Sequence, residues 1–296
     1  MMPIMPTAIT ADGRLDEASQ RRVVRYCLDA GAVAIGHFGI ASEFYKIPHD
    51  MRRRLINIIV DEVGGRVPVF FGVTSPAVAI SLDYAREAEQ LGGDLIMSSL
   101  PYVDPPTPDA AMPYFAALSD ATTLPLIVQD TPQTSATLTA DLICRMAAQI
   151  ERIAHVKAEG AAFIAKTAEL IRQGEGRLSV IGGAGGRHLI HLLRLGVTAF
   201  MTGTEALELH GRAVASFLAG DEAQAADIYY QQIVPYLQFY LDYPEELLKA
   251  MLHRRGIIDI PEILPPRASL PMSDVERQEF EWVLQRIGYG NAKPTP

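Results

Sequence analysis

The chain has 296 residues, of which 49% are hydrophobic and 21% charged, and its formal net charge at pH 7 is −9. This length suits one large domain or two small ones, and an α/β barrel typically needs roughly 250 residues. The acidic balance argues against nucleic acid or an anionic membrane as the main partner. Two cysteines, Cys27 and Cys144, are too few for a disulfide framework. Residues 1–10 lack a basic leader and no apolar run could span a bilayer, so we expect a cytoplasmic protein.

Short β-branched stretches alternate with amphipathic stretches along the first two thirds of the chain. The β-branched stretches are nearly continuous apolar runs, a pattern typical of strands buried on both faces of a parallel sheet. Strands are therefore predicted over residues 3–9, 32–38, 67–73, 94–98, 124–129, 152–157, 177–181 and 198–202. Helices are predicted between them, over residues 16–30, 48–63, 76–91, 107–121, 139–150, 161–173 and 187–195.

An unbroken alternation of strand and helix favours a (β/α)8 TIM barrel, an α/β fold. A doubly wound open sheet is the competing topology, since pattern alone rarely defines strand order. Strand signals stop after Gly203, and the remaining helices are predicted over residues 204–218, 221–240, 245–253 and 273–287. The first of these completes the barrel. We therefore predict a barrel catalytic domain over residues 1–220 and a C-terminal helical appendage over residues 221–296.

One lysine differs from the rest in its surroundings. Lys157 closes an apolar strand, and strand alternation places it on the same face as His155 and Glu159. Burial lowers the pKa of a lysine, and a free amine can attack a carbonyl to form a Schiff base. The alternative is a lysine at a strand end that pairs with Glu159 and performs no chemistry, and the pattern favours neither. The other lysines, predicted on helical surfaces or in the tail, are Lys46, Lys166, Lys249 and Lys293.

The order of several motifs resembles that of the dihydrodipicolinate synthase and N-acetylneuraminate lyase superfamily, barrels that use a Schiff-base lysine. Residues 39–43 (GIASE) stand where the family has Gly-x-x-Gly-Glu, and residues 129–132 (QDTP) stand where it has Tyr-Asn-x-Pro. Residues 155–159 (HVKAE) match the lysine motif, while Gly182-Gly183 and Thr202-Gly203 follow the last two strands. The resemblance implies a Schiff base on Lys157, no cofactor and no metal, a small 2-keto acid as substrate, and a homo-oligomer, a tetramer in this family.

Several departures from the family pattern are informative. Gln129 occupies the position of a tyrosine that relays protons, and Val103 occupies that of a second tyrosine. Thr134 falls where the synthases carry an arginine that holds the second substrate. Ile40 and Ala41 replace the hydroxyl residues that hold the pyruvyl carboxylate. A role in lysine biosynthesis is therefore disfavoured.

The Gln-Asp-x-Pro variant, together with Lys-x-Glu, instead resembles the branch that contains 2-keto-3-deoxy-L-arabonate (3-deoxy-pentonate) dehydratases. Dehydration needs a base at C3 and an acid for the C4 hydroxyl, with the iminium as electron sink. We predict Lys157, Glu159 and Gln129 as catalytic residues. Glu159 is the candidate for a proton transfer, and the alternative role, as a mere charge partner of Lys157, has equal weight.

A wider set of residues is predicted to contact the substrate. Asp130 precedes a Thr-Pro step and could instead shape a turn, and Glu43 is more readily structural than catalytic. The glycines would allow close backbone approach to a carboxylate. The predicted substrate-binding residues are Ser42, Glu43, Tyr102, Asp130, Gly182, Gly183, Thr202 and Gly203.

Two alternatives to a dehydratase follow from the same residues. The first is a pyruvate-dependent aldolase or synthase, because the Schiff-base lysine serves both reactions. The second is a non-catalytic descendant that binds a keto acid, because the family tyrosine and the hydroxyl motif are both missing. Retention of Lys157 in an apolar strand favours an enzyme.

Overall fold

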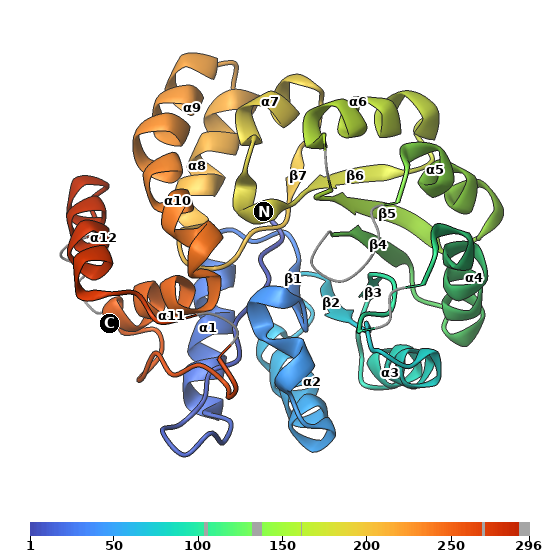
Figure 1. The fold of residues 1–296 in the computed structure, drawn as a ribbon, viewed down its shortest axis with the longest axis horizontal. Helices are drawn as coiled ribbons and strands as arrows, with labels where there is room; N and C mark the ends of the chain where they lie inside the picture. Colours follow the sequence, from blue (N-terminus) through green and yellow to red (C-terminus); the bar gives the residue numbers. More distant parts are fainter. Residues whose placement is uncertain (104–105, 132–137, 161, 268–269, 290–296) are drawn as a thin grey trace. The chain divides into compact units, whose positions relative to one another are not determined.

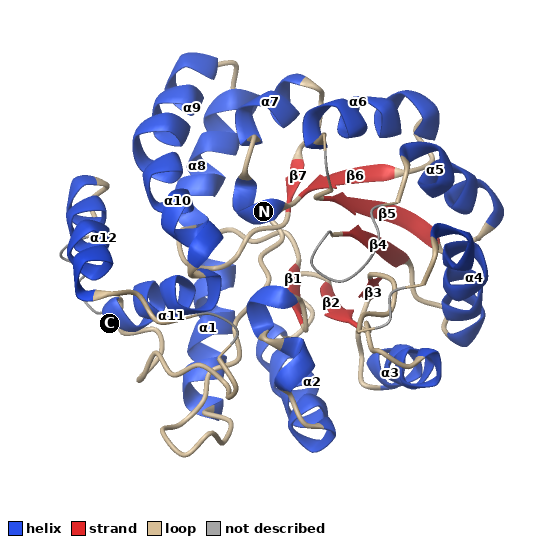
Figure 2. Ribbon diagram, viewed as in Figure 1, coloured by secondary structure: helices blue, strands red, loops and turns tan. Residues whose placement is uncertain are grey.

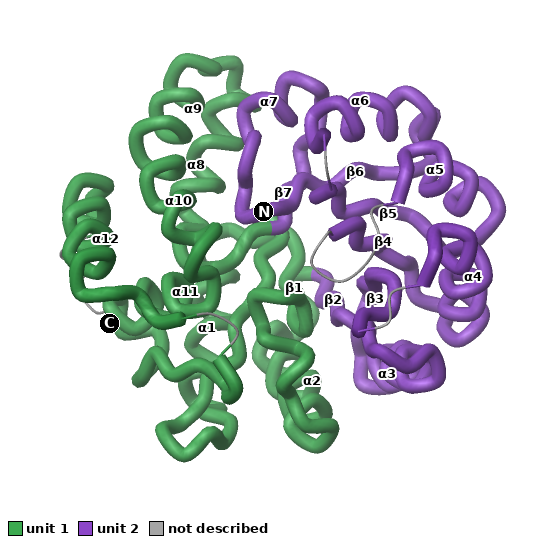
Figure 3. The backbone as a smooth tube through the Cα atoms, in the orientation of Figure 1, with its two compact units in different colours: residues 1–67, 202–296 green, residues 68–201 purple. Residues whose placement is uncertain are grey.

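The computed structural model describes residues 1–103, 106–131, 138–160, 162–267 and 270–289. The chain divides into two compact units, the first formed by Met1–Val67 with Thr202–Pro296 and the second by Pro68–Met201 (Figure 3). The predicted boundary at residue 220 falls inside the first unit, between two of its helices, and stays a prediction. Among the described residues, no helix is both long and apolar enough to cross a membrane.

The second unit is built around a parallel sheet whose strands pair in chain order. The strands described in it are β2 (Val69–Gly72), β3 (Leu95–Ser98), β4 (Leu126–Asp130), β5 (Ile153–Ala158), β6 (Ser179–Gly182) and β7 (Ala199–Phe200). A doubly wound sheet reverses its strand order at one point, and the sequential order found here has no such reversal. The order agrees with the predicted barrel topology and disagrees with the doubly wound alternative.

Helices follow the strands of this unit along the chain. They are α3 (Val78–Gln90), α4 (Ala111–Ala121), α5 (Ala140–Gln149), α6 (Phe163–Gly174) and α7 (Leu189–Arg194). They lie along one face of the sheet (Figures 1 and 2). Helix α5 begins where predicted because the Thr139 hydroxyl accepts a hydrogen bond from the backbone N–H of Leu142 at 3.2 Å. The buried polar side chains of these strands lie at or near the carboxyl ends of β3, β4 and β5, and they are Ser98, Gln129, Asp130 and Lys157.

The first unit is mostly helical. Its elements are α1 (Glu17–Asp29), β1 (Ile35–His37), α2 (His49–Val63), α8 (Leu207–Leu218), α9 (Glu222–Ile228), α10 (Val234–Asp242), α11 (Pro244–Arg254) and α12 (Asp274–Arg286). The predicted helix over residues 221–240 is divided into α9 and α10 by a π-helical turn over Tyr229–Ile233. The other predicted C-terminal helices agree with α8, α11 and α12.

Seven of the eight predicted strands are confirmed, with ends that agree within three residues. The exception covers residues 3–9, which form only isolated bridges, from Ile4 to Gly36 and from Ile9 to Leu15. Pro3 and Pro6 explain the difference, because proline has no backbone N–H to donate to a ladder.

The prediction that the remaining lysines lie on surfaces is wrong for three of them. The side chains of Lys46, Lys166 and Lys249 are 3%, 8% and 1% exposed. Glu43 is within 2.9 Å of the Lys46 ammonium and 2.6 Å of the Lys249 ammonium, and Asp130 pairs with Lys166. A buried charge needs such a partner, and those of Lys166 and Lys249 lie far away in sequence, where helical periodicity cannot reveal them. Lys293 lies outside the described residues.

The first unit also buries a carboxyl group without a hydrogen-bond partner in the described part of the chain. Glu205 lies between β7 and α8, is fully buried, and neither of its carboxyl oxygens has a hydrogen-bond partner among the described residues. Burial raises the pKa of Glu205 from 4.5 to about 7. The folded protein therefore holds this proton at pH values where the unfolded chain has released it.

This arrangement predicts a pH-dependent stability difference between the protein and its Glu205→Gln variant. From about pH 4.5 to 7 the folded state binds the proton and the unfolded state does not, so the Glu205 contribution to stability falls as pH rises. The variant carries no such proton, so it should gain about 3 kcal/mol relative to the parent across that range. Urea denaturation of both proteins from pH 4 to 8 measures the difference, and a constant difference would contradict the prediction.

Candidate active site

Lys157 and Gln129 lie side by side at the carboxyl ends of neighbouring strands. They are Cα partners in the register of β4 and β5, so their side chains leave the same face of the sheet. Lys157 is only 8% exposed, and its strand neighbours Val156 and Ala158 are fully buried. The expectation of an ammonium group in a poorly solvated place therefore agrees with the structure.

The Glu159 carboxylate connects Lys157, Gln129 and the loop after β6. Its Oε1 lies 3.1 Å from the Lys157 Nζ and accepts a hydrogen bond from the Ala184 backbone N–H at 2.7 Å. Its Oε2 accepts a hydrogen bond from the Gln129 Nε2 at 3.1 Å. Both oxygens are thus held in place, and one is close enough to exchange a proton with the lysine amine. The three residues predicted as catalytic are brought together.

The glycines after β6 make room for this carboxylate. A Cβ built on Gly183 would overlap the Cγ of Glu159, and one on Gly182 would lie 2.7 Å from Phe200. Residue 183 must therefore be glycine if Glu159 is to keep its position beside Lys157. This reason concerns packing, and direct contact of Gly182 and Gly183 with a substrate stays a prediction.

Asp130 and Tyr102 lie at the same end of the sheet. Asp130 is buried, pairs with Lys166, and accepts a hydrogen bond from the Leu138 backbone N–H at 3.0 Å. One of its oxygens thus bonds to the chain after β4, and the other bonds to a lysine of α6. Tyr102 is half-buried, and burial raises the pKa of its hydroxyl. Their predicted contacts with substrate stay predictions, and Thr134 lies outside the described residues.

The first unit contains the other predicted site residues, and there they stabilise loops. The Ser42 hydroxyl donates to the Met5 carbonyl at 2.5 Å, and the Ser42 carbonyl accepts from the Thr7 hydroxyl at 2.7 Å. Glu43 has a left-handed backbone with φ of 58° and holds the two buried lysines described above. These contacts agree with the structural interpretation of Glu43. The substrate-binding roles of Ser42 and Glu43 stay predictions.

Thr202 and Gly203 lie directly after β7. The Thr202 hydroxyl donates to the Gly203 carbonyl at 2.9 Å. A Cβ on Gly203 would overlap the Oε2 of Glu205, so this glycine accommodates a carboxyl group as Gly183 does. Sequence reasoning missed Glu205, although an acidic residue two positions beyond a predicted pocket glycine was a usable signal. Contact of Thr202 and Gly203 with substrate stays a prediction.

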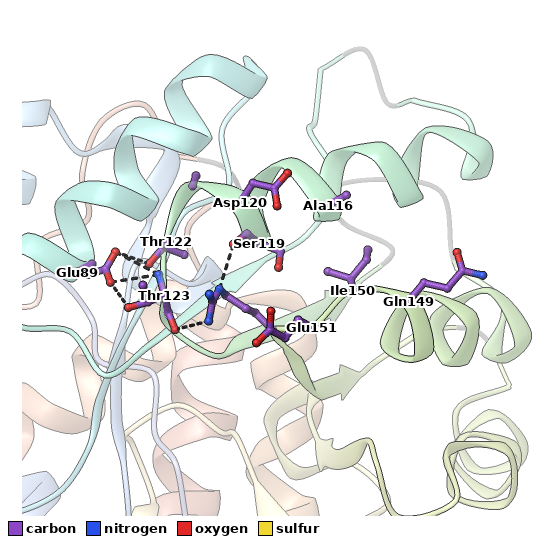
Figure 4. Close-up of a pocket in the computed structure, with 11 residues that line it drawn as sticks. Glu89, Ala116, Ser119, Asp120, Thr122, Thr123, Gln149, Ile150 and Glu151 are labelled. Carbon is purple, nitrogen blue, oxygen red and sulfur yellow. Dashed lines mark hydrogen bonds between the residues drawn. The ribbon is translucent and has the colours of Figure 1, made fainter.

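A separate hollow of about 500 Å³ lies at the opposite, amino-terminal ends of β4 and β5 (Figure 4). Some of its polar groups are paired with one another. Glu89 accepts hydrogen bonds from the Thr122 hydroxyl at 2.9 Å and the Thr123 N–H at 3.1 Å. Arg152 donates to the carbonyls of Ser119 at 3.1 Å and Thr123 at 2.9 Å. Because Lys157 is at the other end of β5, this hollow is not where its chemistry takes place.

No metal site is evident in the described ranges, since no three histidine, cysteine or acidic side chains there could share an ion. The chemistry that this geometry offers is that of an amine beside a carboxylate. A buried primary amine with a proton acceptor at 3.1 Å can attack a carbonyl carbon, and the neighbouring acid can move the protons that this attack requires.

Sequence comparison finds relatives of two kinds. The chain is 34% identical over 209 residues to L-2-keto-3-deoxyarabonate dehydratase of Azospirillum brasilense, covering 69% of this chain and 67% of that protein. It is 27% identical over 289 residues to 4-hydroxy-tetrahydrodipicolinate synthase of Alkalilimnicola ehrlichii, covering 97% and 96%. The predicted resemblance to both branches is confirmed.

Comparison with solved structures finds proteins of similar fold. The dihydrodipicolinate synthase of Thermotoga maritima superposes with a TM-score of 0.88 at 21% identity, covering 97% of this chain and 98% of that one. A prophage protein of the dihydrodipicolinic acid synthase family from E. coli, solved in complex with pyruvate, gives 0.88 at 23% identity, covering 98% and 99%. These likenesses establish the fold. A model described as the dihydrodipicolinate synthetase family matches residues 1–287. The chain belongs to the dihydrodipicolinate synthetase family.

Proposed function

We propose that the protein is a lyase that dehydrates a sugar-derived 2-keto-3-deoxy acid of the pentonate type through a Schiff base on Lys157. The observation that carries the proposal is the buried Lys157 amine, 3.1 Å from a Glu159 carboxylate that Gln129 and Ala184 hold. The 34% identity to a 2-keto-3-deoxyarabonate dehydratase supports the choice of reaction. The covalent Schiff base replaces any cofactor in this scheme.

The first step is imine formation. Glu159 takes a proton from Lys157, and the free amine attacks the C2 carbonyl of the substrate. Glu159 returns the proton to the former carbonyl oxygen, which leaves as water, and an iminium remains between the Lys157 Nζ and C2. Its positive charge lies beside the Glu159 carboxylate, which stabilises it in a site with little water.

The second step removes water from C3 and C4. Glu159 takes a proton from C3, and the electron pair moves toward the iminium nitrogen to form an enamine. The enamine then expels the C4 hydroxyl, which leaves as water after receiving a proton from Glu159. For a 3-deoxy-pentonate, tautomerisation and hydrolysis of the imine release 2-oxoglutarate semialdehyde and restore the Lys157 amine.

Gln129 favours dehydration over carbon–carbon cleavage. Retro-aldol cleavage needs a base that takes the proton from the C4 hydroxyl, and an amide cannot act as that base near neutral pH. Gln129 instead donates to Glu159 and orients its carboxylate. The similarity to 4-hydroxy-tetrahydrodipicolinate synthase, which extends over nearly the whole chain, keeps an aldolase or synthase as the second candidate. The products distinguish the two.

The proposal also covers the closure of the barrel and the oligomeric state of the protein. We infer that the strands close into a (β/α)8 barrel, a topology supported by their sequential order and by the TM-scores of 0.88. We also expect a homo-oligomer, a tetramer by resemblance to the family.

Reduction with borohydride tests the Schiff base. Incubation with pyruvate or a 2-keto-3-deoxy acid, followed by borohydride, should add the mass of the reduced substrate to the peptide that contains Lys157. Lys157→Arg should abolish both the adduct and turnover, because guanidinium stays protonated and is no nucleophile. Peptide mass spectrometry provides the measurement. An unmodified Lys157 in a protein that turns over such acids would refute the mechanism.

Glu159→Gln tests the proton transfers. We expect turnover of a 2-keto-3-deoxy-pentonate to slow by about 10²- to 10⁴-fold while borohydride still traps the adduct after long incubation. Glu169→Gln, which alters an exposed ion pair with Arg172 on α6, is the matched control and should retain full turnover. Assays for semialdehyde and for pyruvate should detect the semialdehyde alone. Pyruvate and an aldehyde as main products would replace this proposal with the aldolase.

Gly183→Ala tests whether the position of Glu159 matters as well as its presence. The new Cβ would displace the Glu159 side chain, so turnover should fall by at least 10-fold although no catalytic group has been removed. Gly211→Ala on α8 is the control, since its Cβ would meet only Met1 Cγ at 3.9 Å. Equal steady-state rates in the parent and Gly183→Ala would show that Glu159 need not be held in place.

A further inference from the structure

A buried ion pair lies behind the carboxyl end of β4. Asp130 is the last residue of β4, and its carboxylate pairs with the ammonium group of Lys166 on α6. Both side chains are buried. Strand alternation turns the Asp130 side chain to the face opposite the one that carries Gln129 and Lys157. The ion pair therefore lies on the side of the sheet that faces α6, away from the lysine amine of the candidate site.

The same ion pair binds both backbone polar groups of Leu138. The Leu138 N–H donates to the Asp130 Oδ1 at 3.0 Å, and the Leu138 carbonyl accepts a hydrogen bond from the Lys166 Nζ. Leu138 directly precedes Thr139, the N-cap residue of α5. The end of β4 is thus attached both to the start of α5 and to α6, all within the second unit.

The backbone of Asp130 holds the residue that lies beside the amine. The Asp130 carbonyl accepts a hydrogen bond from the Glu159 N–H at 3.1 Å, one residue beyond the end of β5. The Glu159 carboxylate lies 3.1 Å from the Lys157 Nζ. It also accepts a hydrogen bond at 3.1 Å from Gln129, the residue before Asp130 in β4. The strand end that Lys166 anchors therefore holds Glu159 through its backbone and through its carboxylate.

Charge makes this attachment stronger than a neutral hydrogen bond would. Hydrogen bonds between ionised groups are shorter and stronger than those between neutral groups. A buried carboxylate or ammonium group without a partner is costly, so neither Asp130 nor Lys166 can leave the other without a large penalty. The end of β4 is consequently held with the precision that proton transfer at Glu159 requires.

We propose that Lys166 is a positioning residue for the Schiff-base chemistry. Through Asp130 it anchors the strand end that holds Glu159. The Glu159 carboxylate is thereby kept within proton-transfer distance of the Lys157 amine. This inference rests on the proposed function, and it adds to that function a helix residue on the far side of the sheet from the amine.

Lys166→Met tests the proposal by comparing turnover with binding. Proton transfer depends steeply on distance, whereas the attraction between opposite charges falls slowly with it. We expect turnover of a 2-keto-3-deoxy-pentonate to fall by at least about 10-fold, while the pyruvate concentration that half-saturates borohydride trapping stays within about 3-fold of the parent value. Arg172→Met, which breaks an exposed ion pair with Glu169 on the same helix, should change neither quantity.

The Glu159→Gln background provides a second measurement. Because Lys166 acts through Glu159, Lys166→Met should slow turnover by less than about 2-fold when Glu159→Gln is already present. A general loss of structure would slow turnover by the same factor in both backgrounds. Equal slowing in the two backgrounds, or full turnover in Lys166→Met itself, would overturn the positioning role alone.

A double variant, Asp130→Asn with Lys166→Met, separates positioning from the cost of an unpaired buried charge. It leaves no unpaired charge, and its amide oxygen can still accept from the Leu138 N–H. We expect a folded protein by circular dichroism whose turnover is still reduced by at least about 10-fold, because the attachment to α6 is missing. Parental turnover in this variant would contradict the inference. Absence of any borohydride adduct in the parent would instead overturn the proposed function, and this inference with it.

Discussion

The candidate site depends on the ion pair between Lys157 and Glu159 at the buried carboxyl end of β5. An ammonium group on β5 is tolerated because Glu159, two residues later, places a carboxylate 3.1 Å away. That carboxylate is in turn held by the Gln129 amide and the Ala184 N–H, so three strand ends are joined through one side chain. The requirement for glycine at position 183 follows from the same carboxylate, because no Cβ fits beside it.

Two carboxyl groups near strand ends illustrate how surroundings assign different roles to one functional group. Glu159 has three polar partners, which retain it as an acceptor beside the lysine. Glu205 has no partner in the described structure, and its burial raises its pKa to about 7. Each carboxyl occupies space that a glycine leaves open. The same residue type therefore provides a hydrogen-bond acceptor in one unit and a group that resists ionisation in the other.

Buried lysines show that a cation inside this chain is not by itself a sign of catalysis. Lys46 and Lys249 share Glu43, and Lys166 is paired with Asp130. Lys157 differs because it stands on a strand, at its carboxyl end, where a parallel α/β sheet presents side chains to a ligand. Its register partner on β4, Gln129, is polar without being charged. Position on the sheet distinguishes the lysine that we propose to be reactive from the structural ones.

The sequence by itself determined the order of strands and helices and the placement of Lys157, Glu159 and Gln129, because apolar periodicity and strand alternation are local properties. It also indicated the family through motifs at strand ends. Only the tertiary structure decided that Lys46, Lys166 and Lys249 are buried, that Glu205 lacks a partner, and that residues 3–9 form bridges instead of a strand. These outcomes depend on groups that are distant along the chain, as Glu43 is from Lys249. Likewise, Gln129 lies beside Lys157 only because the register of β4 and β5 aligns two residues that are distant along the chain.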